Sequence, residues 1–268
     1  MTTLTGPAAR AGLTLTGRRV IVTGASSGLG AHIVRELARL GADVLAAARR
    51  RDRLEALAAE LADAPRPVVP WTADVSVESD VGSMVAAAVA AFGGLDVLVN
   101  NAGSEVQGPI DSLPDEAFEG MWRANVRSVF LTTRAALPEL RRSRGMVINL
   151  GSTVVARPPR GRFGYVASKG AVEAMSRALA LDLGRDGIRV NVIRPGIIPS
   201  ELRGLSEEAE RARLETGVSF GRQALSAVGD GRDVAAAVAW LAGDGGRFVT
   251  GAVIDVDGGF TLGAADPI

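Results

Sequence analysis

The chain of 268 residues has no cysteine and contains only one histidine, His32, one tyrosine, Tyr165, and one lysine, Lys169. The absence of cysteine excludes disulfides, zinc sites with thiolate ligands and a cysteine nucleophile. A Ser-His-Asp triad would have to use His32, and a Schiff-base enzyme would have to use Lys169. Few catalytic arrangements therefore remain, and none of the motifs in the sequence predicts a metal site.

Charge of neither sign is in excess, because the chain contains 30 basic and 30 acidic side chains. Arginine is spread along the whole chain, so no basic stripe of the kind that binds a phosphate backbone is present. The longest uncharged, apolar-leaning stretch, 81–95, is shorter than the roughly 20 residues that a bilayer requires, and the first residues lack the apolar core of a signal peptide. We therefore expect a cytoplasmic protein with a small-molecule substrate, and neither nucleic acid nor a membrane as its partner.

Short β-branched runs alternate with Ala/Leu-rich helical stretches from end to end, which is typical of a parallel sheet with helices on both faces. We predict an α/β, doubly wound Rossmann fold with a mainly parallel seven-stranded sheet. The predicted strands lie near 18–23, 43–48, 67–72, 96–100, 146–150, 188–193 and 252–257. The predicted helices lie near 29–40, 51–62, 77–92, 114–142, 163–184 and 231–242.

No linker, composition shift or internal repeat divides the chain, so we expect one domain. It should run from 16 to 268, after a loose N-terminal tail of residues 1–15. The charged stretch 197–230 interrupts the alternation of strands and helices. We expect it to be a partly helical insertion, with a substrate lid at about 197–225.

A glycine-rich loop, TGASSGLG at 23–30, lies between the first predicted strand and the first predicted helix. Glycines in this place let the backbone approach a pyrophosphate, and the N–H groups at the helix N-terminus bind the anion. A glycine turn without a ligand is the alternative, but the strand–turn–helix context favours a dinucleotide site. The predicted contacts are Gly24, Ser26, Ser27, Gly28, Leu29 and Gly30.

The second predicted strand ends at Ala48 and is followed by Arg49, Arg50 and Arg51, about 20 residues beyond the loop. A dinucleotide site keeps an acidic residue here for the ribose 2′-hydroxyl, or an arginine for a 2′-phosphate. The acid is missing, so Arg49 and Arg50 favour NADP(H) over NAD(H) as the cofactor. A solvated basic start to the second helix is the alternative, although cations at a helix N-terminus are unfavourable.

Tyr165 and Lys169 are four residues apart at the start of a predicted helix, so the two side chains lie on one face. An ammonium near the phenol lowers the pKa of the phenol and brings it toward acid/base chemistry at neutral pH. The alternative is a tyrosine on a helix face with a lysine beside it by chance. Ser152 follows the fifth predicted strand, and ligands bind outside the carboxyl ends of parallel strands, so all three residues converge there.

These motifs resemble those of the short-chain dehydrogenase/reductase family, in its single-domain branch of about 250 residues. The T-G-x-x-x-G-x-G loop of the family matches 23–30, its Y-x-x-x-K pair matches Tyr165 and Lys169, and its catalytic serine matches Ser152. The resemblance covers nearly the whole chain. Ser200 departs from the family pattern, which has threonine there. Enoyl reductase relatives space their tyrosine and lysine more widely than this chain does.

The resemblance also implies roles for residues that the pattern alone does not mark. Asn125 matches the asparagine that holds a proton-relay water and counts with the catalytic residues. Helices 114–142 and 163–184 match those that form a homotetramer, or a homodimer. Further cofactor contacts are implied at Asp74, Val75, Asn101, Ala102, Gly103, Tyr165, Lys169, Pro195, Gly196, Ile198 and Ser200.

The implied reaction interconverts a ketone or aldehyde and an alcohol, with Ser152 and Tyr165 binding the oxygen and Tyr165 as the acid/base. Substrate candidates include 3-oxoacyl thioesters and other small ketones. A NAD-dependent polyol, sugar or steroid-type alcohol dehydrogenase is an alternative, and a non-catalytic NADP-binding sensor is another. We expect His32 to be a surface residue without catalytic function. Arginines at 157, 160 and 162 are expected to form a solvated loop, with contact to an anionic substrate as the alternative.

Overall fold

The computed structural model describes residues 13–203, 205–216, 224–225 and 227–263. Its centre is one sheet of seven strands in the order β3-β2-β1-β4-β5-β6-β7, and every pair of neighbouring strands is parallel. The predicted doubly wound fold with a seven-stranded sheet is confirmed. The strands are β1 Arg19–Thr23, β2 Asp43–Ala48, β3 Val68–Thr72, β4 Val97–Asn100, β5 Met146–Leu150, β6 Arg189–Pro195 and β7 Val253–Val256.

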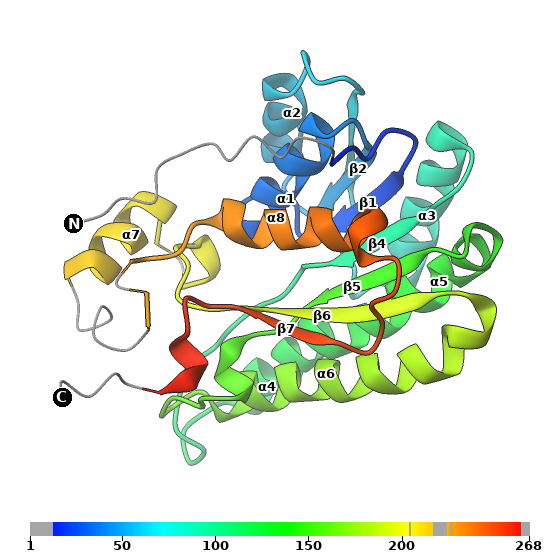
Figure 1. Ribbon diagram of the computed structural model, residues 1–268. Helices are drawn as coiled ribbons and strands as arrows, with labels where there is room; N and C mark the ends of the chain where they lie inside the picture. The colour runs from blue at the N-terminus through cyan, green and yellow to red at the C-terminus, as the bar shows by residue number, and fades with distance from the viewer. Residues whose placement is uncertain (1–12, 204, 217–223, 226, 264–268) are drawn as a thin grey trace.

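Helices cover both faces of this sheet (Figure 1). One face carries α1 Gly28–Arg39, α2 Arg51–Glu60 and α8 Gly231–Ala242, and the other carries α3 Glu78–Phe92, α5 Ser128–Ser143 and α6 Phe163–Leu183. The central strands are buried on both sides because their side chains are almost all apolar, as in β2. The sheet is therefore a rigid support whose carboxyl-end loops hold the functional groups.

The core consists of two hydrophobic clusters, one on each side of the sheet. Ile33 and Leu37 of α1 lie in the first cluster together with Val238 of α8. Met84 of α3 and Leu140 of α5 lie in the second. All five side chains are almost completely removed from solvent, so each face of the sheet contributes its own apolar burial to stability.

The predicted helix at 114–142 is not one regular helix. The chain forms α4 Asp115–Trp122, then a π-helical segment, η1 Arg123–Arg127, and then α5. A π-helical turn takes up one residue more than an α-helical turn and often marks a functional position. The buried residue in η1 is Asn125, one of the predicted catalytic residues.

The expected boundary of the packed domain at residue 16 is wrong, because Leu15 belongs to the core. Its side chain is buried, and its backbone N–H donates to the carbonyl oxygen of Leu40, 2.8 Å away. Leu13 also packs against the first hydrophobic cluster. The apolar residues of this short segment cover the end of α1, so the packing begins before the first strand. Residues 1–12 lie outside the described residues.

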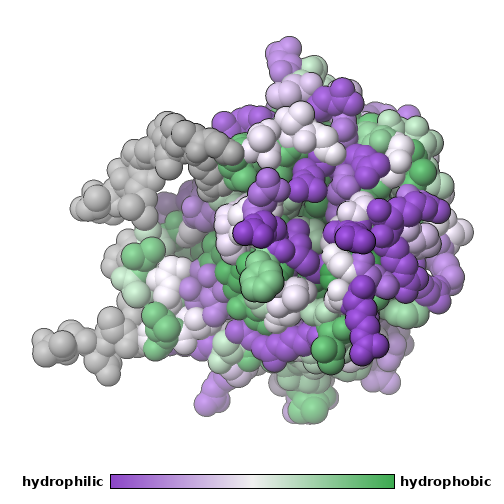
Figure 2. All heavy atoms as spheres, turned by 45° about the vertical axis from the view of Figure 1, so that its right-hand side comes forward, coloured by the Kyte–Doolittle hydropathy of each residue, from purple (hydrophilic) through white to green (hydrophobic). Residues whose placement is uncertain are grey.

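The charged segment after β6 is partly helical, as predicted, with η4 Glu201–Arg203 and α7 Glu207–Thr216. Figure 1 places α7 beyond the carboxyl end of β6, apart from the helices that cover the sheet. Within the predicted insertion, residues 204, 217–223 and 226 lie outside the described residues. On the face seen in Figure 2, hydrophilic residues cover most of the surface and hydrophobic ones gather in small separate patches.

Candidate active site

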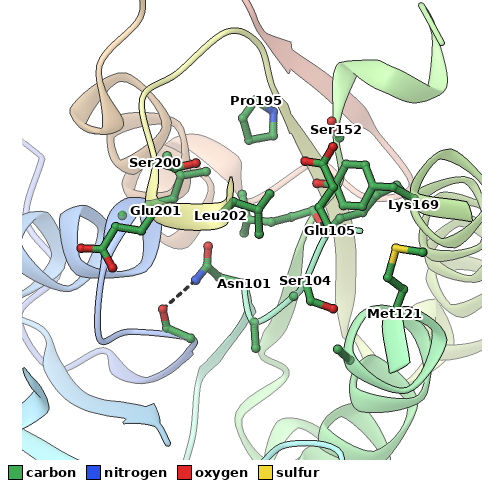
Figure 3. Close-up of a pocket in the computed structure, with 18 of the residues that line it drawn as sticks. Asn101, Ser104, Glu105, Met121, Ser152, Lys169, Pro195, Ser200, Glu201 and Leu202 are labelled. Atoms are coloured by element: carbon green, nitrogen blue, oxygen red, sulfur yellow. Dashed lines mark hydrogen bonds between the residues drawn. The ribbon is translucent and has the colours of Figure 1, made fainter. Parts of the chain in front are cut away.

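A cleft of about 1030 Å³ opens at the carboxyl ends of the strands. Figure 3 shows Ser152, Glu105 and Lys169 toward one end of it, Ser200 and Glu201 toward the other, and Asn101 between them. The cleft brings together nearly all of the residues that the sequence predicts for the site. They are Gly24, Ser26, Ser27, Gly28, Leu29, Arg49, Arg50, Asp74, Val75, Asn101, Ala102, Gly103, Ser152, Tyr165, Lys169, Pro195, Gly196, Ile198 and Ser200.

Two predicted site residues, Gly30 and Asn125, do not line the cleft. Gly30 packs against the turn before it, where an added Cβ atom would lie 2.2 Å from the carbonyl oxygen of Gly24. Gly30 has a packing role, since only a residue without a side chain lets α1 approach the loop. Asn125 is buried behind the cleft wall.

The glycine loop leaves the N-terminus of α1 open toward the cleft. Ser27 is the N-cap residue of α1, but its side chain makes no capping hydrogen bond, so the first N–H groups of the helix are available to an anion. Gly24 has a φ of +66°, and a Cβ atom there would lie 2.7 Å from the Cα atom of Ala102. Glycine is thus required where two backbone segments meet, and the donors of this turn fit a pyrophosphate.

Two arginines stand at the start of α2, beside this loop. Arg50 donates from Nη2 to the hydroxyl oxygens of Ser26, at 3.0 Å, and Ser27, at 2.6 Å. Arg49 lines the cleft, and no hydrogen bond or ion pair of its side chain occurs within the described part of the chain. The two guanidinium groups give this end of the cleft the positive charge that a 2′-phosphate would require.

Asp74 occupies the wall next to these arginines. Burial opposes ionisation of its carboxyl, but hydrogen bonds from Ser76 and the charge of Arg49 together hold the pKa of Asp74 below its usual value. Its Oδ1 atom accepts from the backbone N–H of Ser76 at 2.9 Å and from the hydroxyl of Ser76 at 2.7 Å. The carboxylate is therefore charged and fixed at neutral pH.

Asn101 braces the floor of the cleft between the two ends. Its side-chain amide donates to the carbonyl oxygens of Thr23, at 2.9 Å, and Gly24, at 3.1 Å. The hydroxyl of Thr23 in turn accepts from the backbone N–H groups of Asn101 and Ala102. The loop after β4 is thereby fastened to the glycine loop after β1, which fixes the width of the cleft at this point.

Tyr165 and Lys169 are both buried in the first turns of α6. The Nζ atom of Lys169 lies 5.8 Å from the centroid of the Tyr165 ring and donates a hydrogen bond of 2.7 Å to the carbonyl oxygen of Leu150. Burial lowers the pKa of Lys169 to about 8, against the opposing charge of Glu173. The only lysine of the chain is thus a desolvated cation next to the only tyrosine.

Ser152 and Asn125 approach this pair from two other elements. Ser152 follows β5, and its hydroxyl oxygen accepts from the backbone N–H of Val154 at 3.4 Å. Asn125 donates to the hydroxyl of Ser168 at 2.9 Å, and Ser168 donates to the backbone carbonyl of Tyr165 at 2.8 Å. A chain of hydrogen bonds therefore runs from the π-helical segment to the backbone of the tyrosine.

Glu105, in the loop after β4, lies in the cleft wall. Its carboxylate lies 3.0 Å from Nε of Arg162, and its side chain is only 2% exposed. Arg162 is the residue before α6, so the pair joins the loop after β4 to the helix that carries Tyr165 and Lys169. Arg157 also lines the cleft and stacks on the ring of Phe260, 4.6 Å from its centroid. Of the three arginines in this loop, Arg160 is exposed and does not line the cleft.

His32 has a partner that the sequence did not indicate. A hydrogen bond joins its Nε2 atom to Glu207 Oε1 of α7, 3.0 Å away, and an added Cβ at Gly231 would fall within 2.3 Å of the imidazole ring. His32 does not line the cleft. It fastens α1 to α7, and the 175 residues that separate the partners explain why no local pattern predicts the contact.

The described residues contain neither a membrane-spanning helix nor a candidate metal site. No helix among them is long and apolar enough to cross a bilayer. Nor do they contain a group of three or more His, Cys, Asp or Glu side chains that could hold a metal ion.

A parallel Rossmann sheet with a glycine loop, a buried tyrosine–lysine pair and a serine in one cleft defines a NAD(P)-dependent oxidoreductase. The family model described as enoyl-(acyl carrier protein) reductase matches residues 24–261. With this match and the relatives below, the chain belongs to the short-chain dehydrogenase/reductase family. The predicted resemblance is confirmed.

Relatives from several bacteria are similar over nearly their whole length. A 4-formylbenzenesulfonate dehydrogenase from Comamonas testosteroni is 35% identical, with 89% of this chain and 96% of the relative covered. The 3-oxoacyl-(acyl-carrier-protein) reductase FabG from Haemophilus influenzae is 32% identical, with 92% and 99% covered. The solved RhlG/NADP active-site complex from Pseudomonas aeruginosa has a TM-score of 0.86 and 34% identity, with 93% and 98% covered.

Proposed function

We propose that the chain is an NADP(H)-dependent oxidoreductase that interconverts a ketone or aldehyde and the corresponding alcohol, with Tyr165 as the acid/base. The observation that carries this proposal is the burial of Tyr165 and Lys169 one helical turn apart in the cleft that Ser152 also lines. A phenol beside a fixed cation exchanges protons more readily near neutral pH than a phenol in water.

Four residues of the chain have a part in this reaction. The hydroxyls of Ser152 and Tyr165 bind the carbonyl oxygen of the substrate, and Tyr165 gives its proton to that oxygen as negative charge develops there. Lys169 stabilises the resulting phenolate electrostatically, and Asn125 positions the backbone that carries Tyr165 through Ser168. When bound, the nicotinamide group supplies or accepts the hydride.

Several residues support NADP(H) as the cofactor. The open N-terminus of α1 is suited to the pyrophosphate, and Arg49 and Arg50 stand where a 2′-phosphate would be recognised. Asn101 lies between this end and the catalytic end, where Lys169 stands. Solved relatives in complex with NADP, among them the Pseudomonas aeruginosa protein, are consistent with this preference.

The substrate end of the cleft is mixed in character, with apolar residues such as Met121, Leu202 and Phe260 beside Arg157 and the Glu105–Arg162 pair. We include 3-oxoacyl thioesters and other small ketones among the candidates, since one relative is named as a 3-oxoacyl-(acyl-carrier-protein) reductase. The segment 197–225 is proposed as the lid over this end. The four-residue Tyr–Lys spacing argues against enoyl reduction.

We also propose that the chain forms a homotetramer or a homodimer. Large apolar side chains are exposed on α4, α5 and α6, namely Trp122, Phe130 and Leu181, and burial against a second copy would remove them from water. Light scattering during size-exclusion chromatography tests this directly, and a monomer at all concentrations would contradict it.

The experiment that tests the function is a panel of carbonyl compounds with NADPH and NADH, followed by the absorbance of the reduced nicotinamide. The panel should include 3-oxoacyl thioesters, sugars, steroids, aromatic aldehydes and short ketones. Turnover with NADPH, lost in Tyr165→Phe, is the expected result. Tight NADPH binding without turnover of any compound would identify a sensor instead of an enzyme.

A further inference from the structure

The carboxylate of Glu201 links the lid segment η4 to the start of α2. Its Oε2 atom lies 3.2 Å from Nη1 of Arg50 and 2.5 Å from Nη1 of Arg53. Glu201 is 151 residues from Arg50 in the chain, so this is a tertiary contact between the lid and the cofactor end of the cleft. Figure 3 shows Glu201 at the end opposite to Ser152 and Lys169.

The same guanidinium group of Arg50 is held by the glycine loop. Nε and Nη2 both donate to the hydroxyl oxygen of Ser26, and Nη2 also donates to Ser27. These bonds leave Nη1 for the carboxylate of Glu201. Burial opposes ionisation of Glu201, but the hydrogen bonds from Arg53 and Arg50 hold the pKa of this carboxyl below its usual value. Arg50 therefore already carries a negatively charged partner that belongs to the protein.

We propose that Glu201 is an internal anion that competes with the 2′-phosphate of the cofactor for Arg50. The inference rests on the proposed function in one respect, namely that Arg50 belongs to the part of the cleft that receives the 2′-phosphate. Two anions on one guanidinium repel each other, so the phosphate must displace Glu201 from Arg50. The 2′-hydroxyl of NAD(H) carries no charge and leaves the contact intact. Glu201 is thus a specificity-determining residue that weakens NADP(H) relative to NAD(H).

Displacement of Glu201 also affects the lid. Its neighbour Leu202 lines the cleft, and its other neighbour Ser200 faces Gly28 of the glycine loop, where an added Cβ would lie 3.5 Å from the Ser200 Cβ. When the carboxylate leaves Arg50, η4 loses one of its two charged anchors on α2.

The test compares two ligands that differ only in the 2′-phosphate, adenosine 2′,5′-bisphosphate and adenosine 5′-monophosphate. Their dissociation constants are measured by calorimetry on the full-length protein and on Glu201→Gln. The amide keeps the size of the side chain and removes its charge. We expect the bisphosphate to bind about fivefold more tightly to the variant, in line with the loss of one exposed charge contact. The monophosphate should change by less than about twofold.

Glu55→Gln is the matched control. Glu55 pairs with Arg51 on α2, 2.7 Å away, so this variant makes the same change in net charge without touching Arg50. It should leave the ratio of the two dissociation constants unchanged. Equal tightening in both variants, or no tightening in Glu201→Gln, overturns the competition.

The competition between Glu201 and the 2′-phosphate can be confirmed or refuted independently of the proposed preference for NADP(H). A wild-type enzyme that prefers NADH, combined with tightening in Glu201→Gln, would refute the preference and retain the competition. A wild-type enzyme that prefers NADPH, with no change in the variant, would refute only the competition.

Discussion

The Nζ atom of Lys169 donates a 2.7 Å hydrogen bond to the carbonyl oxygen of Leu150, the last residue of β5. This bond ties α6 to the strand that leads into Ser152. The cation is therefore fixed relative to both the tyrosine on its own helix and the serine on the neighbouring loop. Because the acceptor is a main-chain atom, the arrangement does not depend on which side chain occupies position 150.

Replacement of Tyr165 by phenylalanine keeps the ring and removes the proton donor. We expect kcat/KM to fall about a thousandfold, the middle of the range for the loss of a general acid. The affinity for NADPH, measured by fluorescence titration, should change by less than about twofold, since the variant keeps the shape of the cleft wall. Activity within about tenfold of the wild type would contradict the role of Tyr165.

Lys169→Met tests the cost of the buried cation. The folded pKa of about 8 lies below the ordinary 10.5, so between these pH values the unfolded chain binds a proton that the folded chain has released. The free energy of unfolding of the wild type therefore increases as the pH rises through this window, because the folded chain no longer buries a charge. The variant buries no charge at any pH. Near neutral pH it should therefore be more stable than the wild type by about 1–3 kcal/mol.

Urea denaturation of both proteins without cofactor, at several pH values from about 7 to about 10, measures the difference. The difference in stability between the variant and the wild type should shrink as the pH rises. Parallel pH dependences in the two proteins would show that the lysine does not titrate in this window.

Arg49→Asp reverses the charge of the arginine beside Asp74. The carboxylate repels a 2′-phosphate and accepts from a 2′-hydroxyl, so kcat/KM with NADPH should fall and that with NADH should rise. We expect the ratio of the two to change by about a hundredfold, or about 2.7 kcal/mol of differential binding. Arg51→Asp, two residues away and not in the cleft wall, is the control. An unchanged ratio in Arg49→Asp would refute recognition by this residue.

Gly30→Ala introduces a methyl group where the backbone of the preceding turn lies. The added Cβ would lie 2.2 Å from the Gly24 carbonyl oxygen and 2.6 Å from the side-chain amide nitrogen, Nδ2, of Asn101. We expect a loss of about 1–3 kcal/mol in stability from this overpacking, together with weaker binding of NADPH. Gly82→Ala in α3 is the matched control, because no atom lies within 4 Å of its added Cβ, and it should stabilise the helix by about 0.5–1 kcal/mol. Equal thermal shifts in the two variants would contradict the expected role of Gly30.

The strands and most of the helices could be predicted because their patterns are local. β2 and β5 begin and end at the predicted residues, since a run of apolar residues bounded by polar ones defines a buried strand. The same holds for Tyr165 and Lys169, whose common face follows from helical spacing alone.

The features that the sequence did not predict depend on long-range contacts or on small differences in backbone geometry. Arg49 and Arg50 read alike in the sequence, but only Arg50 is held by the glycine loop. Glu105 finds Arg162 and His32 finds Glu207 only after the sheet has brought distant segments together. The π-helical turn around Asn125 differs from an α-helix in one hydrogen-bond register, which apolar periodicity does not report.

Because of the π-helical turn, the geometry of the site depends on the number of residues in this segment. A π-helical turn holds one residue more than an α-helical turn, so deleting one residue from Arg123–Arg127 would let the segment close into a regular α-helix while α4 and α5 kept their places. The side chain at position 125 would then leave the place from which Asn125 bonds Ser104 and Ser168. Every side chain of the site could be present in such a shortened chain, and the hydrogen bonds from Asn125 through Ser168 to the backbone of Tyr165 would still be broken.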